Sequence, residues 1–114
     1  HGYMNKIAFK KTIETKEAYY WSRTRQALWH KGKTSGFVQK VVELRIDDDQ
    51  DAVWMKVNIG KGASCHVGYI SCFYRSIPLG KIKDSKKISM KFKEKKKKFN
   101  PDKVYKGQPN PTKL

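Results

Sequence analysis

The chain has 114 residues, a formal net charge of +16 and 38% apolar residues. This length allows one domain with a modest core. No apolar run approaches the roughly 20 residues of a membrane-spanning helix, and no charged-then-apolar leader is visible, so we expect a cytoplasmic protein rather than a membrane or secreted one. The opening residues 1–4 are typical of the end of a strand and do not start with Met, so we expect a natural upstream strand region to be missing.

The positive charge is concentrated in the last third of the chain. Residues 1–75 carry 13 Lys and Arg against 7 Asp and Glu, a net +6, whereas residues 76–114 carry 13 against 3, a net +10. All four prolines also lie in residues 76–114. We therefore predict one folded domain over 1–75, followed by a Lys-rich tail over 76–114 that is partly helical or disordered.

In the first third of the chain, the predicted elements are short. Asn5 is a good N-cap for a helix over 6–14. The aromatic residues of 18–21 predict a strand. Residues 22–36 are rich in Arg, Lys, Gly, Ser and Thr, which is typical of loops with at most one helical turn.

The middle of the chain carries the clearest strand signals. Apolar and polar residues alternate over 38–46 and again over 52–59, which predicts two strands joined by a hairpin loop. A further strand is predicted over 67–75, and residues 86–99 are compatible with a basic helix. The fold class that follows is α+β, with a small, mostly antiparallel sheet and a short helix.

The loop between the two central strands is strongly acidic, since four of its five residues are Asp. These carboxylates repel one another unless a cation or basic groups neutralise them. The i, i+2, i+4 spacing of Asp47, Asp49 and Asp51 points oxygens to one side of an extended loop, and Mg²⁺ and Ca²⁺ prefer oxygen ligands. The alternative is a solvated turn, because Asp favours turns.

A second cluster consists of Cys65, His66 and Cys72. Thiolate and imidazole ligands suit zinc, and a catalytic zinc needs about three protein ligands and an open position for water. Two cysteines alone are one ligand short of this number. His66 or a carboxylate would complete the set. The alternative is a pair of buried, inert thiols.

A third stretch combines basic, hydroxyl and glycine residues with tryptophans. Guanidinium groups and free backbone N–H groups suit phosphate binding, and a tryptophan ring can stack on a purine. A basic surface over core tryptophans, or a nucleic-acid site, fits the same features. The candidate residues are Trp21, Ser22, Arg23, Arg25, Trp29, Lys31, Thr34, Ser35 and Gly36.

Taken together, these stretches resemble the phosphoribosyl-AMP cyclohydrolase family, in the family's order, over nearly all of residues 2–75. The resemblance is carried by Tyr3-Met4-Asn5, Thr12-Ile13-Glu14-Thr15, Tyr20-Trp21-Ser22-Arg23-Thr24-Arg25, Leu28-Trp29-His30-Lys31-Gly32-Lys33-Thr34-Ser35-Gly36, Gln39-Lys40-Val41-Val42, Asp47 to Asp51, and Ser64-Cys65-His66-Val67-Gly68-Tyr69-Ile70-Ser71-Cys72-Phe73-Tyr74-Arg75.

The resemblance implies a hydrolase of the third step of histidine biosynthesis, which opens the adenine ring of phosphoribosyl-AMP between N1 and C6. It also implies an intertwined homodimer with one zinc per subunit at the interface and Mg²⁺ beside it. Cys65 and Cys72 would bind zinc, and Asp47, Asp49 and Asp51 would bind Mg²⁺. The basic and aromatic residues named above would bind the substrate.

His66 adjoins a zinc ligand of this resemblance, and we expect it to be the catalytic proton-transfer group, since imidazole titrates near neutrality.

Departures from the family pattern bear on these expectations. The family's acidic loop carries a cysteine, the third zinc ligand supplied by the other subunit, where this chain has Asp48. We therefore expect a Cys₂Asp site that binds zinc less tightly and accepts Mn²⁺ or Fe²⁺ more readily. The Lys-rich tail is expected to be unlike the family. Two alternatives are a basic nucleic-acid-binding module, whose tail binds nonspecifically, and an inactive cyclohydrolase-like fragment.

Overall fold

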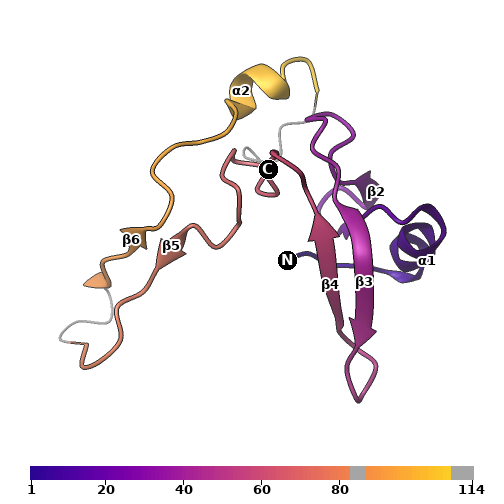
Figure 1. Cartoon of the computed structure of the whole chain (residues 1–114), viewed down its shortest axis with the longest axis horizontal. Helices are drawn as coiled ribbons and strands as arrows, with labels where there is room; N and C mark the ends of the chain where they lie inside the picture. Colours follow the sequence, from indigo (N-terminus) through magenta and orange to yellow (C-terminus); the bar gives the residue numbers. More distant parts are fainter. Residues whose placement is uncertain (83–86, 109–114) are drawn as a thin grey trace.

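The structure is a computed structural model that describes residues 1–82 and 87–108. Its strands pair antiparallel as β1–β2, β3–β4 and β5–β6. Short helices and small antiparallel sheets confirm the predicted α+β class (Figure 1). Within the described residues, no helix has the length and apolar character needed to cross a membrane. The elements are α1 (Lys6–Thr15), β1 (Tyr19–Ser22), β2 (Ala27–His30), β3 (Lys40–Ile46), β4 (Val53–Asn58), β5 (Arg75–Ser76), β6 (Lys91–Phe92) and α2 (Pro101–Val104).

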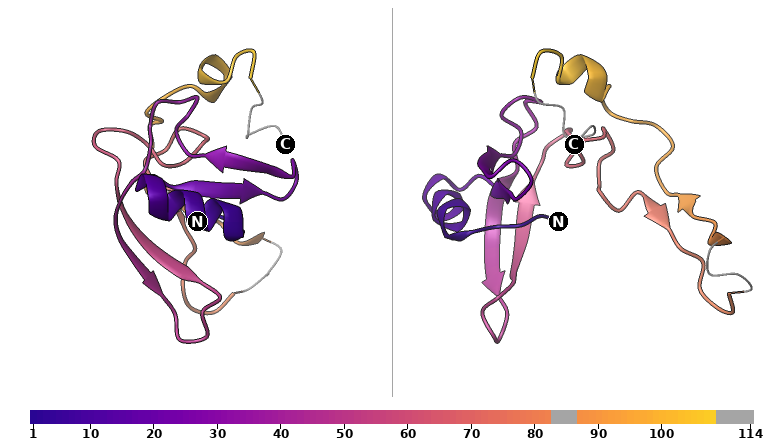
Figure 2. Two further views of the ribbon diagram at one scale, coloured as in Figure 1. Left: turned by 90° about the vertical axis from the view of Figure 1, so that its right-hand side faces the viewer. Right: turned by 180° about the vertical axis from the view of Figure 1, so that it is seen from behind.

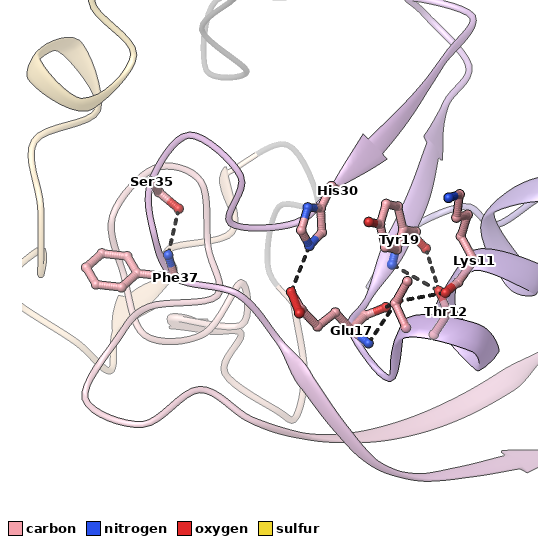
Figure 3. A network of polar contacts seen from close by, with 8 residues as sticks. Lys11, Thr12, Glu17, Tyr19, His30, Ser35 and Phe37 are labelled. Carbon is pink, nitrogen blue, oxygen red and sulfur yellow. Dashed lines mark hydrogen bonds and ion pairs between the residues drawn. The ribbon is translucent and has the colours of Figure 1, made fainter.

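Helix α1 confirms the prediction over 6–14. The side chain of Asn5 accepts a hydrogen bond from the Ala8 N–H at 2.9 Å, which caps the first turn. The helix ends at Lys16, whose φ of 61° is left-handed and whose N–H bonds to the Thr12 carbonyl. The hydroxyl of the buried Thr12 donates to the Ala8 carbonyl at 2.8 Å and accepts from the Tyr19 N–H at 3.0 Å (Figure 3). This hydroxyl therefore ties α1 to β1.

Strand β2 was not predicted, because residues 22–36 were expected to be loops. It pairs with β1 so that Tyr19 lies opposite His30 and Ser22 opposite Ala27. The rings of Tyr19 and His30 stack with centroids 4.4 Å apart, and His30 Nε2 lies 2.9 Å from a Glu17 carboxylate oxygen (Figure 3). Cross-strand contacts of this kind stabilise a hairpin whose local composition is loop-like.

Strands β3 and β4 confirm the predicted hairpin. Leu44 lies opposite Met55, and a bulge interrupts the register between Val41 and Glu43. The hairpin joins the first one through a hydrogen bond from the Ala18 N–H to the Gln39 carbonyl. Seen from the front and from behind, α1 and β1–β2 lie on one side of β3–β4, and residues 75–82 and 87–104 lie on the other (Figures 1 and 2).

Two predictions for the second half were wrong. The strand predicted over 67–75 is a tight loop followed by the two-residue β5, because Gly68 turns the chain with a φ of +107°. The basic helix is absent from the described residues 87–99, which are mostly extended and contain β6. Lysines four residues apart, such as Lys87, Lys91 and Lys95, would repel one another along one face of a helix. Residue 86 of that prediction lies outside the described part of the chain.

The core is small, and few apolar side chains in it are fully buried. Its buried apolar residues include alanines from α1 and from the segment before β1, together with Cys65 and Tyr105. Phe99 joins this core between Phe37 and Tyr105, with ring centroids 5.5 and 6.3 Å away. Many large apolar side chains of the C-terminal half remain exposed, and Leu79 is 99% exposed.

Candidate active site

The largest concentration of predicted site residues surrounds one pocket of about 540 Å³. Its wall combines the N-terminal segment, both strands of the first hairpin, β4 and the loop that carries the cysteines. The predicted residues in its lining are Trp21, Ser22, Trp29, Lys31, His66 and Cys72; the others include Tyr3, Tyr20, Gln39, Met55, Val57, Ile59, Ile70 and Phe73. A pocket of this volume falls in the range of small-molecule sites.

The loop over residues 64–72 brings the two cysteines side by side. The Ser64 N–H donates to the Ile70 carbonyl at 2.9 Å, and the Cys65 N–H donates to the Tyr69 carbonyl at 3.1 Å. Both thiols are free; Cys65 is buried and Cys72 is half-buried. Burial raises the pKa of the Cys65 thiol, and the nearby Cys72 raises it further. Two adjacent thiols without a disulfide have the chemistry to coordinate a metal ion such as zinc.

Lys31 lies beside these thiols. It is only 6% exposed, and its Nζ is 5.0 Å from the centroid of the Trp29 ring. Burial lowers the pKa of Lys31, while Cys72 and Cys65 act in the opposite direction. A buried lysine needs compensating groups, and here the aromatic face and the two sulfur atoms supply them.

His66 faces the same tryptophan. The two rings are tilted, with centroids 6.0 Å apart. Burial lowers the pKa of His66, and the positive charges of Lys31 and Arg25 lower it further. This lowered pKa favours the neutral imidazole, which has a nitrogen that can accept a proton.

The predicted phosphate-binding residues are only partly brought together. The guanidinium of Arg25 lies 5.8 Å from the Trp29 ring centroid, and its buried Nε has no hydrogen-bond partner among the described residues. Arg23 instead lies over the Tyr3 ring at 4.7 Å. Thr34, Ser35 and Gly36 lie in the turn after β2, outside the pocket lining. The hydroxyl of Ser35 is within hydrogen-bonding reach of Tyr105 in the tail.

The acidic loop forms a separate cluster. Among the residues that the structure describes, Asp47, Asp48 and Asp49 have ligand oxygens within 4.8 Å of one another, and all three side chains are exposed. Asp47 Oδ1 accepts from the Asp51 and Ala52 N–H groups at 3.1 and 3.0 Å. The Ala52 amide is the main reason that the pKa of Asp47 falls to about 2. The side chain of Asp47 raises the pKa of Asp51.

This acidic cluster and the cysteine pair lie at opposite ends of the β3–β4 hairpin (Figure 1). β4 has six residues, which at roughly 3.3 Å per residue separates its ends by about 20 Å. Asp48 therefore lies in the turn at one end of the hairpin, whereas the loop that carries Cys65 and Cys72 follows its other end.

Sequence reasoning missed two kinds of site residue. Tyr20 donates from its hydroxyl to Gln39 Oε1 at 2.7 Å, and burial raises the pKa of Tyr20 to about 12. The aromatic run over 18–21 indicated this position, but it was assigned only to a strand. Glu94 in the tail contacts the cysteine loop, and its lysine-rich surroundings gave no signal of that contact.

Comparison with known proteins identifies the class of this site. Residues 1–74 match the family model described as phosphoribosyl-AMP cyclohydrolase. A phosphoribosyl-AMP cyclohydrolase of Rhodopseudomonas palustris (strain TIE-1) is 52% identical over 104 residues, which cover 91% of this chain and 67% of that protein. One of Nitrobacter winogradskyi is 46% identical over 94% of this chain and 71% of its own length, and one of Brucella abortus is 57% identical over 67% and 65%.

The protein is therefore a hydrolase. It belongs to the phosphoribosyl-AMP cyclohydrolase family, which serves histidine biosynthesis. The match to the Rhodopseudomonas protein covers 104 residues and so extends beyond residue 75. The family model ends at residue 74, whereas this relative also matches part of the Lys-rich tail.

Proposed function

We propose that this chain hydrolyses the N1–C6 bond of the adenine ring in 1-(5-phosphoribosyl)-AMP, the third step of L-histidine biosynthesis. The observation that carries the proposal is the meeting of the Cys72 thiol, an imidazole and a tryptophan ring at one pocket, with the buried Cys65 thiol beside Cys72. Each has a distinct task in opening a purine ring with water: holding a metal, moving a proton and stacking on the base.

The donor atoms at this pocket fit zinc. Cys65 and Cys72 would hold the ion, because adjacent sulfur donors suit zinc and the two thiols form no disulfide. When bound, zinc supplies a Lewis acid that lowers the pKa of water toward neutrality. The burial that raises the pKa of the Cys65 thiol is offset on metal binding, since a coordinated thiol is deprotonated.

The third ligand would be Asp48 from a second copy of the chain. Within one chain, Asp48 lies at the far end of the β3–β4 hairpin from the cysteines. A homodimer that brings the acidic loop of one subunit to the cysteine loop of the other resolves this separation. The resulting Cys₂Asp set contains a harder ligand than Cys₃, so it would bind zinc less tightly and accept Mn²⁺ or Fe²⁺ more readily.

The same acidic loop would hold Mg²⁺ through Asp47, Asp49 and Asp51. These carboxylates repel and hydrogen-bond to one another, and as a result the side chain of Asp47 raises the pKa of Asp51. A divalent cation would relieve the repulsion between these carboxylates, and hard cations prefer oxygen ligands.

The remaining pocket residues would bind and orient the substrate. Trp29 presents its ring toward His66 and Lys31, and this ring would stack on the purine beside His66 as the proton acceptor. Arg25 lies outside the pocket lining, beside the Trp29 ring, and its guanidinium would make charge-assisted hydrogen bonds to a phosphate. The neutral imidazole of His66 would take the proton from the attacking water and return one to the ring nitrogen as the bond breaks.

The test is the change in absorbance when the purine ring of phosphoribosyl-AMP opens. The full chain would be assayed after chelation, and again with Zn²⁺ and Mg²⁺ restored. We expect activity to disappear on chelation and return with the metals, and Cys72→Ser to stay inactive under both conditions. A parent chain that turns over equally with and without chelator would refute the metal-dependent mechanism.

A further inference from the structure

Glu94 contacts the cysteine loop with both of its carboxylate oxygens. Oε1 accepts a hydrogen bond from the Ile70 N–H at 2.8 Å, and Oε2 accepts from the Ser71 N–H at 3.0 Å. These are the two backbone amides immediately before Cys72. A carboxylate that receives two backbone N–H groups makes charge-assisted bonds, which are stronger than neutral ones.

The backbone around Ile70 is also hydrogen-bonded to the segment that carries Cys65. The Ser64 N–H donates to the Ile70 carbonyl at 2.9 Å, and the Cys65 N–H donates to the Tyr69 carbonyl at 3.1 Å. Residues 69–71 are therefore fixed between Cys65 on one side and Glu94 on the other. The relative position of the two thiols depends on both sets of bonds.

The tail around Glu94 is itself anchored to the domain before and after this residue. The Lys93 N–H donates to the Tyr74 carbonyl at 2.7 Å, and the Lys98 N–H donates to the Gly68 carbonyl at 2.6 Å. Farther along, Phe99 packs on Phe37 with ring centroids 5.5 Å apart. The placement of the Glu94 carboxylate is thus set by the backbone on both sides of it.

The charge pattern of the tail also singles out this residue. Glu94 is the one acidic residue in the described segment 87–101, where lysine predominates. A lysine at this position would turn a donor toward two N–H donors and leave both amides unpaired. The carboxylate is the group that the exposed amides of Ile70 and Ser71 require.

From this geometry we propose that Glu94 is a positioning residue of the hydrolase, which holds the Cys72 backbone at the spacing from Cys65 that metal binding needs. The proposal rests on the proposed function in one respect, that Cys72 is a metal ligand. The segment of the tail over residues 93–99 is then part of the machinery of the site. Outer groups that orient metal ligands commonly change metal affinity by about 10–100-fold.

The experiment compares Glu94→Ala and Glu94→Gln in the full chain, with Lys95→Gln as the matched control at an exposed neighbour. In the metal-free protein, two rates measure how strongly Glu94 restricts the motion of the cysteine loop. These are amide hydrogen exchange at Ile70 and Ser71 and alkylation of Cys72. Zinc affinity from competition with a chromogenic chelator reports the metal site, and kcat and KM report the reaction.

For Glu94→Ala we expect about tenfold faster exchange and alkylation, about 10–100-fold weaker zinc binding, and a fall in kcat larger than the change in KM. Glu94→Gln keeps one acceptor oxygen, so its exchange rate, alkylation rate and zinc affinity should lie between those of Glu94→Ala and the parent. If Glu94→Ala does not fold, the values for Glu94→Gln test the proposal. Values for the Glu94 variants equal to those of Lys95→Gln would overturn the proposal.

The outcomes separate this proposal from the proposed function. A parent chain that binds no zinc would contradict the proposed function and, with it, the metal-positioning role of Glu94. A parent that binds zinc through Cys72, with an unchanged affinity in Glu94→Ala, would overturn the role of Glu94 alone.

Discussion

Gly68 lies directly against the backbone of Phe99. A β-carbon at Gly68 would stand 2.4 Å from the Phe99 carbonyl oxygen and 3.1 Å from the β-carbon of Lys97. The φ of Gly68 is +107°, a conformation that residues with side chains rarely adopt. The cysteine loop can therefore approach the tail this closely only because residue 68 is a glycine.

Gly68→Ala should lower the free energy of unfolding by about 1–3 kcal/mol more than Gly80→Ala does. Gly80 has a similar φ of +116° but open space around its missing β-carbon, so the comparison separates the clash from backbone strain. Urea unfolding of both variants measures the difference. Equal losses of stability would show that the tail does not pack against the loop in solution.

Thr12→Val should destabilise the fold by about 1–3 kcal/mol, because valine has the same shape but leaves the Tyr19 N–H without its hydroxyl partner. Thr15→Val is the matched control, since the hydroxyl of Thr15 also bonds within α1 but is exposed. We expect that control to change stability by no more than about 0.5 kcal/mol. Thermal unfolding that ranks the two variants equally would argue against the bond between α1 and β1.

Alkaline pH should destabilise the protein through Tyr20, whose folded pKa is raised to about 12. Above pH 10 the unfolded chain loses the phenol proton while the folded chain keeps it, so the unfolded state binds fewer protons. Stability is then constant below pH 10 and falls between pH 10 and 12, by at most about 2–3 kcal/mol.

Tyr20→Phe should remove this contribution to the loss of stability at alkaline pH. The variant also lacks the hydrogen bond to Gln39 at every pH. The measurement is the difference in unfolding free energy between parent and variant from pH 8 to 11.5. A difference that stays constant across this range would contradict a raised pKa for Tyr20.

Asp48→Cys should raise zinc affinity and shift metal preference toward zinc and cadmium over Mn²⁺, because a thiolate is a softer ligand than a carboxylate. Competition titrations of the parent and the variant with each metal provide the test. The same affinity and the same preference in both proteins would exclude Asp48 from the ligand set.

The elements that sequence predicted correctly depend on local patterns. Helix α1 begins at a capping Asn5 and β3–β4 alternates apolar and polar residues around an acidic turn, so neighbours in sequence decide both structures. Strand β2 depends instead on its pairing with β1. The basic segment near Glu94 was expected to be helical because Ile88 and Phe92 have helical spacing, but tertiary contacts hold it extended.

In the candidate site, too, some residues could be predicted from the sequence and others depend on tertiary contacts. Residue types that signal chemistry, such as Cys65, Cys72 and His66, could be named from the sequence, and the pocket places Cys72 and His66 together. Lys31 was expected to bind phosphate; the sequence did not indicate that it would be buried beside the thiols. Glu94 could not be found, because its function depends on a contact 23 and 24 residues away in the chain.

In the proposed function, two copies of the chain together complete one hydrolytic metal site. Asp48→Ala and Cys72→Ser chains, each inactive alone, would be co-expressed with different tags, and the mixed dimers would be isolated and assayed for opening of phosphoribosyl-AMP. A mixed dimer contains one site with an intact Cys65 and Cys72 from one chain and Asp48 from the other, so we predict about half of the parent activity per dimer. Mixed dimers as inactive as either variant alone would contradict a shared site.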